Sequence, residues 1–133
     1  MASPVTVEVE EISNILYVTG IATQKEDSTS VLTLGVVAHN GTNSARNFGT
    51  VYWQIKQDFG TLQSGDKQGS ITDFGTIAAN SSARRSIEVT GCADFIKRGQ
   101  AVIRVYSSAS GVDGREFQIH FLSFEIPTVR PLD

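Results

Sequence analysis

The sequence has little of what disulfide-linked, secreted or membrane-spanning proteins need. Its one cysteine, Cys92, excludes an internal disulfide. No run of about 18 apolar residues is present, so we expect no membrane-spanning helix. The first residues show no basic segment followed by an apolar one, which predicts the absence of a signal peptide. We therefore expect a protein of the cytoplasm or of a virion.

A basic surface is also missing. Eleven Lys and Arg residues stand against 14 Asp and Glu residues, which gives a formal net charge of −3. The basic residues are scattered, and they are adjacent only at Arg84-Arg85 and Lys97-Arg98. Because nucleic-acid-binding domains carry a basic stripe or patch, we expect no nucleic-acid partner. We interpret both basic pairs as parts of solvated strand faces.

No catalytic or metal-binding constellation stands out. The two histidines, His39 and His120, belong to no His-Glu-x-x-His motif, and paired cysteines are absent, so we expect no metal site and no cofactor. A minor hypothesis makes Cys92 the nucleophile of an enzyme, with a histidine as its base. A lone cysteine beside Gly91 is more often a packed thiol, and we expect no enzyme.

What the sequence does contain is apolar residues at every second position, the pattern of half-buried strands. The clearest inward sets are Leu32, Leu34, Val36 and Ala38; Val51, Trp53 and Ile55; and Ala101, Ile103 and Val105. Strands are predicted at 5–10, 15–21, 31–39, 48–56, 70–77, 83–89, 100–106 and 115–124, with a short edge strand at 61–63. Only residues 92–98 favour a helical turn, and His39 to Ser44 is the strongest turn signal.

The tripeptide Phe-Gly-Thr occurs three times, starting at Phe48, Phe59 and Phe74. No phosphate-binding loop or catalytic loop accompanies the Asp-Phe-Gly sequences at 58–60 and 73–75, so a kinase-type role is excluded. We interpret each phenylalanine as an anchor at a strand end, with the glycine allowing a bulge or close approach.

A length of 133 residues predicts one domain, residues 1–133. Short strands with turn signals every 8–15 residues favour an antiparallel sandwich or barrel. We expect an all-β fold, an antiparallel immunoglobulin-like β-sandwich of seven to eight strands. Its core should span about 15–122, with an extended N-terminal arm and a C-terminal arm at about 123–133.

Two stretches carry a family resemblance. Residues 32–41 read LTLGVVAHNG and lead through Ala45-Arg46-Asn47 to the Val51-Tyr52-Trp53 strand, and residues 74–82 read FGTIAANSS before Arg85 to Val89. The chain thus resembles, over about residues 30–122, bacterial immunoglobulin-like or fibronectin-III-like modules of the cell-adhesion-related (CARDB-like) and FxLYD types. The resemblance implies a β-sandwich with a non-enzymatic, interaction-type role.

The alternation of apolar and polar residues shifts by one position in the last strand. Phe117, Ile119 and Phe121 share one face, whereas Leu122, Phe124 and Ile126 fall on the opposite one. A β-bulge would return all six to the core; otherwise the second set is exposed and needs a partner chain to cover it. The candidate interface therefore comprises Leu122, Phe124, Ile126, Pro127, Val129 and Pro131.

These features favour a structural or interaction protein that docks on a larger protein assembly, binds no membrane and forms homo-oligomers. The concrete hypothesis is a bacteriophage capsid cement or decoration protein. The alternative is a carbohydrate- or cell-surface-binding module, in which Tyr52 or Tyr106 stacks on a sugar and the loops at 40–47 and 107–114 form the rim.

Overall fold

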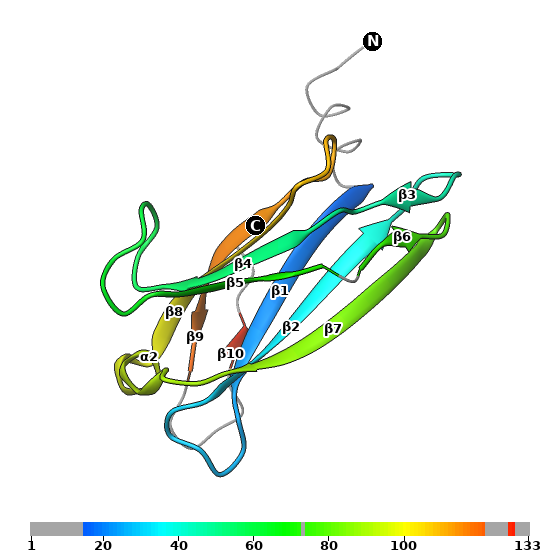
Figure 1. Ribbon diagram of the computed structural model, residues 1–133. Coiled ribbons are helices and arrows are strands. Elements are labelled where there is room, and N and C mark those ends of the chain that lie inside the picture. Colours follow the sequence, from blue (N-terminus) through cyan, green and yellow to red (C-terminus); the bar gives the residue numbers. More distant parts are fainter. Residues whose placement is uncertain (1–14, 73, 122–127, 130–133) are drawn as a thin grey trace.

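The protein is mostly antiparallel β structure, as expected for an all-β chain. The computed structural model describes residues 15–72, 74–121 and 128–129 (Figure 1). Its elements are β1 (Leu16–Gln24), β2 (Leu32–Asn40), β3 (Arg46–Asn47), β4 (Val51–Lys56), β5 (Lys67–Ile71), β6 (Thr76–Ile77), β7 (Ser81–Val89), α2 (Ala93–Arg98), β8 (Gln100–Ser107), β9 (Arg115–His120) and β10 (Thr128–Val129). The expected strand at 5–10 lies outside the described residues.

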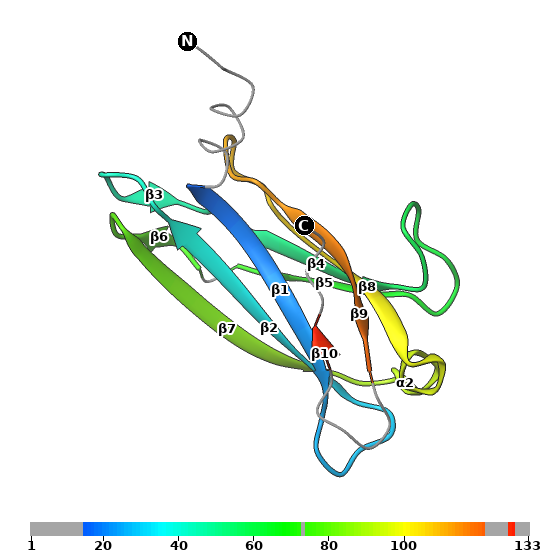
Figure 2. The same cartoon turned by 180° about the vertical axis from the view of Figure 1, so that it is seen from behind.

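The strands form three sheets. One sheet has the order β1-β2-β7, a second has the order β10-β9-β8-β4-β5, and β3 pairs with β6. Every ladder is antiparallel, and an isolated parallel bridge joins Tyr17 to Asp113. β1 packs against β8 and β9, so the two larger sheets meet over one core (Figure 1, Figure 2).

The three inward sets predicted from the alternation are confirmed. The β2 and β8 sets are fully buried, and in the β4 set Val51 and Ile55 are fully buried while Trp53 is 8% exposed. These side chains belong to one hydrophobic cluster that draws on both larger sheets. Burying each large aliphatic side chain contributes roughly 1.5–3 kcal/mol to stability, so this cluster supplies the main driving force for the fold.

The turn after β2 is confirmed, and a buried asparagine organises it. The Asn40 side-chain Nδ2 donates to the carbonyl of Ile77, at 2.9 Å, and to that of Ser44, at 3.0 Å. Its Oδ1 accepts the backbone N–H of Thr42 at 2.9 Å. Asn40 is fully buried, and these bonds satisfy its amide while they join β2 to β6.

Two strand predictions were wrong in position. The edge strand expected at 61–63 is part of a loop, and the fifth strand begins at Lys67. The reason is that Asp66 accepts the backbone N–H groups of Gln57 and Gln63, so these donors bond a side chain instead of a neighbouring strand. The stretch 70–77 is divided between β5, which ends at Ile71, and β6.

The helical turn predicted at 92–98 is confirmed as α2. Gly99 ends it in the left-handed conformation (φ 81°), and its N–H bonds the carbonyls of Phe95 and Ile96. Lys97-Arg98 is therefore part of a helix, which corrects the strand-face interpretation of that pair. Arg84 lies on the exposed face of β7, whereas Arg85 alternates to the other face and lies over the Phe74 ring at 5.0 Å.

Candidate functional site

Most of the predicted interface lies outside the described residues. This holds for Leu122, Phe124, Ile126, Pro127 and Pro131. The backbone of Val129 belongs to β10, where it pairs antiparallel with Ile119 of β9. Since β10 is the last strand of the five-stranded sheet, the described part of this region is a sheet edge. The phase change after Phe121 falls outside the described part of the chain.

The two tyrosines considered for sugar stacking lie side by side. Tyr52 of β4 is opposite Tyr106 of β8, with ring centroids 5.2 Å apart and an interplanar angle of 25°. The guanidinium of Arg104 lies 4.4 Å from the Tyr106 ring centroid. Tyr52 is 36% exposed. Because sugar stacking needs an open ring face and the Tyr106 ring already contacts two neighbours, Tyr52 is the better candidate.

Cys92 is a packed thiol. It is fully buried, and its Sγ donates to the carbonyl of Val89 at 3.4 Å. Burial raises the pKa of this thiol, although the nearby Lys67 charge acts in the opposite direction. A raised pKa disfavours the thiolate, which is the nucleophilic form. Within the described residues, no group of three or more His, Cys, Asp and Glu side chains is arranged to hold a metal ion.

The β4–β5 loop, residues 57–66, is a feature that the sequence reasoning missed. It extends from the body of the fold (Figure 1), and the side chains of three residues, Lys56, Asp66 and Gln57, hold it by hydrogen bonds. Nζ of Lys56 donates to the carbonyl of Gly60 at 2.6 Å. Asp66 Oδ1 accepts the N–H of Gln57 at 3.0 Å, and its Oδ2 accepts that of Gln63 at 2.7 Å. Nε2 of Gln57 also donates to the Ser64 carbonyl at 2.7 Å. These bonds give the loop a defined shape.

This loop exposes two large apolar side chains. Phe59 is 50% exposed and Leu62 is 39% exposed. The interpretation of the three Phe-Gly-Thr phenylalanines as anchors is correct for Phe48, which is fully buried, and for Phe74, which is 4% exposed. It is wrong for Phe59, because the strand expected to hold it does not form. The sequence signal that could have indicated an exposed Phe59 is its position inside a stretch rich in Gly and polar residues.

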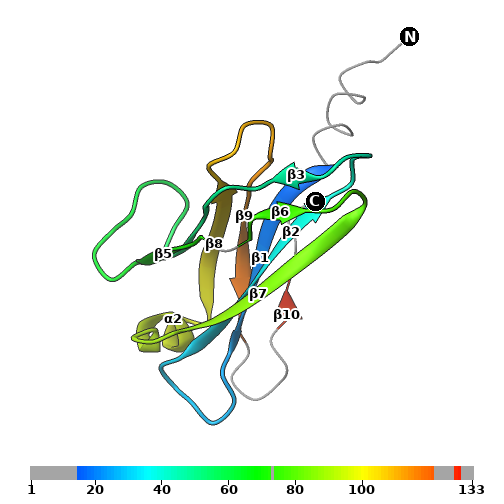
Figure 3. The same cartoon turned by 45° about the vertical axis from the view of Figure 1, so that its right-hand side comes forward.

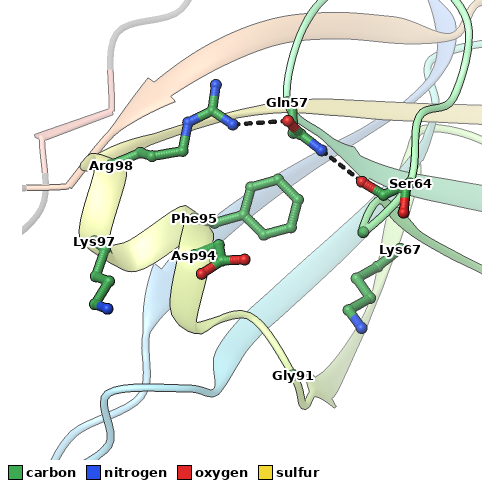
Figure 4. A pocket seen from close by; sticks show the side chains of 9 residues that line it. Gln57, Ser64, Lys67, Gly91, Asp94, Phe95, Lys97 and Arg98 are labelled. Atoms are coloured by element: carbon green, nitrogen blue, oxygen red, sulfur yellow. Dashed lines mark hydrogen bonds between the residues drawn. The ribbon is translucent and has the colours of Figure 1, made fainter.

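A pocket of about 310 Å³ separates this loop from α2 (Figure 4). Gln57, Ser64 and Lys67 line it from one side, and Asp94, Phe95, Lys97 and Arg98 line it from the helix side. Nη1 of Arg98 donates to Oε1 of Gln57 at 2.9 Å, which links the two sides. A shallower depression of about 460 Å³ shares Lys67 and extends to Trp53 and Glu88.

The β4–β5 loop, which carries the exposed apolar pair, and α2, which lines the pocket, lie on the same side of the molecule (Figure 1, Figure 3). We define the docking loop as residues 57–66 and the basic pocket as the cavity lined by Lys67, Lys97 and Arg98. Lys97 and Arg98 occupy the last turn of α2, where cations interact favourably with the free helix carbonyls. Sequence reasoning could not place Lys67 beside them, because the two segments are distant in the chain.

No helix in the described part of the chain has the length and apolar character to cross a membrane. No family model matches the chain, and no curated protein matches it. Among solved structures, it is similar to target SoR45 of the Northeast Structural Genomics Consortium, with a TM-score of 0.44 and 12% sequence identity over 91% of this chain and 86% of that one. A likeness of this degree carries no argument about function.

Proposed function

We propose that this chain is a non-enzymatic interaction protein with an immunoglobulin-like β-sandwich architecture, which docks on a larger protein assembly. The observation that carries the proposal is the braced docking loop with its exposed Phe59 and Leu62. A loop already held in one conformation loses little conformational entropy on binding. An exposed aromatic residue on such a loop is well suited to fill a pocket of a partner.

The architecture in this proposal rests on two supports. Two antiparallel sheets share one core, and residues 32–41 and 74–82 resemble the bacterial immunoglobulin-like modules. Such modules present loops at the ends of their sheets. The docking loop joins two neighbouring strands, β4 and β5, in this way.

The concrete form of the proposal is a bacteriophage capsid cement or decoration protein that also self-associates. Genes for capsid proteins beside the gene of this chain are the first expected observation. Capsids assembled without the chain should then bind the purified full chain in a sedimentation assay. The double variant Phe59→Ser/Leu62→Ser should bind about tenfold or more weakly, because it removes the apolar anchors.

A matched control is Ile15→Ser, since Ile15 is 38% exposed and lies outside the docking loop. It should bind capsids like the wild type. Sedimentation velocity of the free chain tests self-association in the same samples. Capsids that fail to bind the wild type, or that bind the double variant equally well, would refute the docking proposal. A strict monomer at all concentrations would refute self-association.

A second candidate function is carbohydrate binding, and the exposure of Tyr52 favours it. A glycan array probed with the full chain should then give signals that disappear in Tyr52→Ala. Phe59→Ser should leave them unchanged, because Phe59 lies in the docking loop and is not part of the Tyr52–Tyr106 pair. An array without signals above background would remove this candidate.

A further inference from the structure

The basic pocket concentrates positive charge on a protein whose formal net charge is −3. Three cationic side chains line it, Lys67, Lys97 and Arg98, and Asp94 is the one carboxylate among its lining residues. Figure 4 shows Asp94 and Phe95 between the two lysine-bearing segments. The lining therefore carries a formal charge of about +2, since each Lys and Arg is protonated at neutral pH.

Two carboxylates that line the neighbouring depression with Lys67, those of Asp66 and Glu88, have other partners. Both oxygens of Asp66 accept backbone N–H groups of the docking loop. Glu88 forms an ion pair of 2.8 Å with Lys25. Within the described part of the chain, neither Lys67 nor Lys97 forms an ion pair. Among the described residues that line the pocket, only Asp94 offsets this positive charge.

The backbone beside Lys67 leaves space for its ammonium group. Gly91 has φ +72°, and a Cβ at this position would lie 2.8 Å from Nζ of Lys67. Any other residue would strain the backbone and push the ammonium group away. The charge of Lys67 also acts on the buried Cys92. It lowers the pKa of the Cys92 thiol, while burial, the larger effect, raises it.

Two neighbouring features indicate the class of ligand. Phe95 is 3% exposed and forms an apolar part of the pocket lining. The docking loop, which supplies Gln57 and Ser64 to the pocket, also presents Phe59 and Leu62 to solvent. A ligand that contacts both surfaces must combine negative charge with apolar groups, which is the chemistry of a peptide segment. A nucleic acid fits less well, because the chain as a whole carries a formal excess of negative charge.

We propose that the basic pocket binds an acidic segment of a protein partner, whose carboxylates contact Lys67 and Lys97 while apolar residues beside them contact the docking loop. This inference rests on the proposed docking function and names the chemistry of the partner. Arg98 is held in place by Gln57 and contributes charge to the same pocket.

The test is a titration of the isotope-labelled full chain followed by NMR. The probes are a blocked tetrapeptide of two glutamates and two leucines, the same peptide with glutamines, inorganic phosphate, and a single-stranded oligonucleotide. The glutamate peptide should shift the backbone amides of 57–67 and 91–98. Binding should weaken about tenfold or more in Lys67→Gln/Lys97→Gln, and it should weaken with rising salt.

Arg46→Gln is the matched control, because Arg46 is exposed and lies in β3, at the end of the molecule away from α2 (Figure 1). It should bind the glutamate peptide like the wild type. The inference is overturned if the glutamine peptide binds equally well, if phosphate or the oligonucleotide binds more tightly, or if no probe shifts these amides. Amide spectra of each variant show that it is folded.

The experiments distinguish a failure of the pocket inference from a failure of the proposed function. If capsids bind the wild type and Lys67→Gln/Lys97→Gln equally well, the pocket inference fails and docking stands. If the glutamate peptide binds at the pocket and no assembly binds the chain, the assembly role fails while the pocket stands.

Discussion

Nζ of Lys56 lies 2.7 Å from Oε2 of Glu116, and the two side chains are 2% and 32% exposed. The pair joins β4 to β9 across the intervening strand β8. The same ammonium group donates to the carbonyl of Gly60 in the docking loop. The buried ammonium group of Lys56 therefore links the docking loop to Glu116 of β9 in the five-stranded sheet.

This ion pair predicts that replacing Glu116 and replacing Lys56 lower the free energy of unfolding by different amounts. Glu116→Gln should lower the free energy of unfolding by about 3 kcal/mol, because it leaves a buried ammonium group without its counter-charge. Lys56→Met should lower it by about 1 kcal/mol, since the partly exposed carboxylate that remains can be hydrated. Urea denaturation measures both. Glu88→Gln is the control, because its pair with Lys25 is about half exposed and contributes less than about 1 kcal/mol. Equal losses for the two buried-pair variants would contradict the prediction.

Asp66 should decide the shape of the docking loop. Asp66→Ala removes the acceptor of two backbone N–H groups and should lower the free energy of unfolding by about 2 kcal/mol. Amide hydrogen exchange should accelerate at Gln57 and Gln63 by a larger factor than at the core strand β8, where it reports only the loss of global stability. Asp58→Ala is the matched control, because within the described residues Asp58 accepts a single hydrogen bond, a long one of 3.4 Å from the Gln63 side chain. Unchanged exchange in Asp66→Ala would show that the loop is held by other contacts.

Gly69 and Trp53 face each other across the β4–β5 ladder. A Cβ at Gly69 would lie 2.5 Å from Cζ2 of Trp53, so the indole ring must move to accept it. We expect Gly69→Ala to lower the free energy of unfolding by about 1–3 kcal/mol. Ser70→Ala, at the neighbouring exposed position, should change it by less than about 0.5 kcal/mol. Circular dichroism during thermal unfolding compares the two, and an unaffected Gly69→Ala would contradict the tight contact.

Cys92 should react slowly with thiol reagents in the folded chain and quickly in urea. Because burial raises the pKa of Cys92 above its ordinary value of 9.0, the folded state favours the neutral thiol. The resulting stabilisation is complete below the unfolded-state pKa and is lost as the pH rises through the folded-state pKa. Wild-type stability should therefore fall more steeply above pH 9.0 than that of Cys92→Ala. Parallel pH curves for the two proteins would exclude this linkage.

The sequence predicted the long strands well, and the physical reason is clear. In β2, β4 and β8 the apolar residues recur at every second position, and burial of one sheet face specifies that register. The helical turn α2 was also predicted, and in the structure Gly99 ends it in the left-handed conformation. The described part of the chain forms ten strands, of which seven have five residues or more, where seven to eight strands were expected.

The shape of the docking loop and the lining of the basic pocket were not predictable, because neither depends on a local pattern. The three Phe-Gly-Thr copies have different environments, so the tripeptide itself does not determine burial. The loop depends on Asp66 capturing an N–H group nine residues earlier, at Gln57. The pocket depends on bringing Gln57 within hydrogen-bonding distance of Arg98, 41 residues later. Such pairings are set by the sheet topology and not by neighbouring residues.

The position of Trp53 has a practical consequence. It is the single tryptophan of the chain, it packs on Gly69, and it lines the shallow depression that shares Lys67 with the basic pocket. An indole excited in the near ultraviolet changes its emission when the charge or solvation beside it changes. The protein therefore carries one intrinsic fluorophore next to its candidate binding surface, and occupancy of that surface can be followed by light emission without a label.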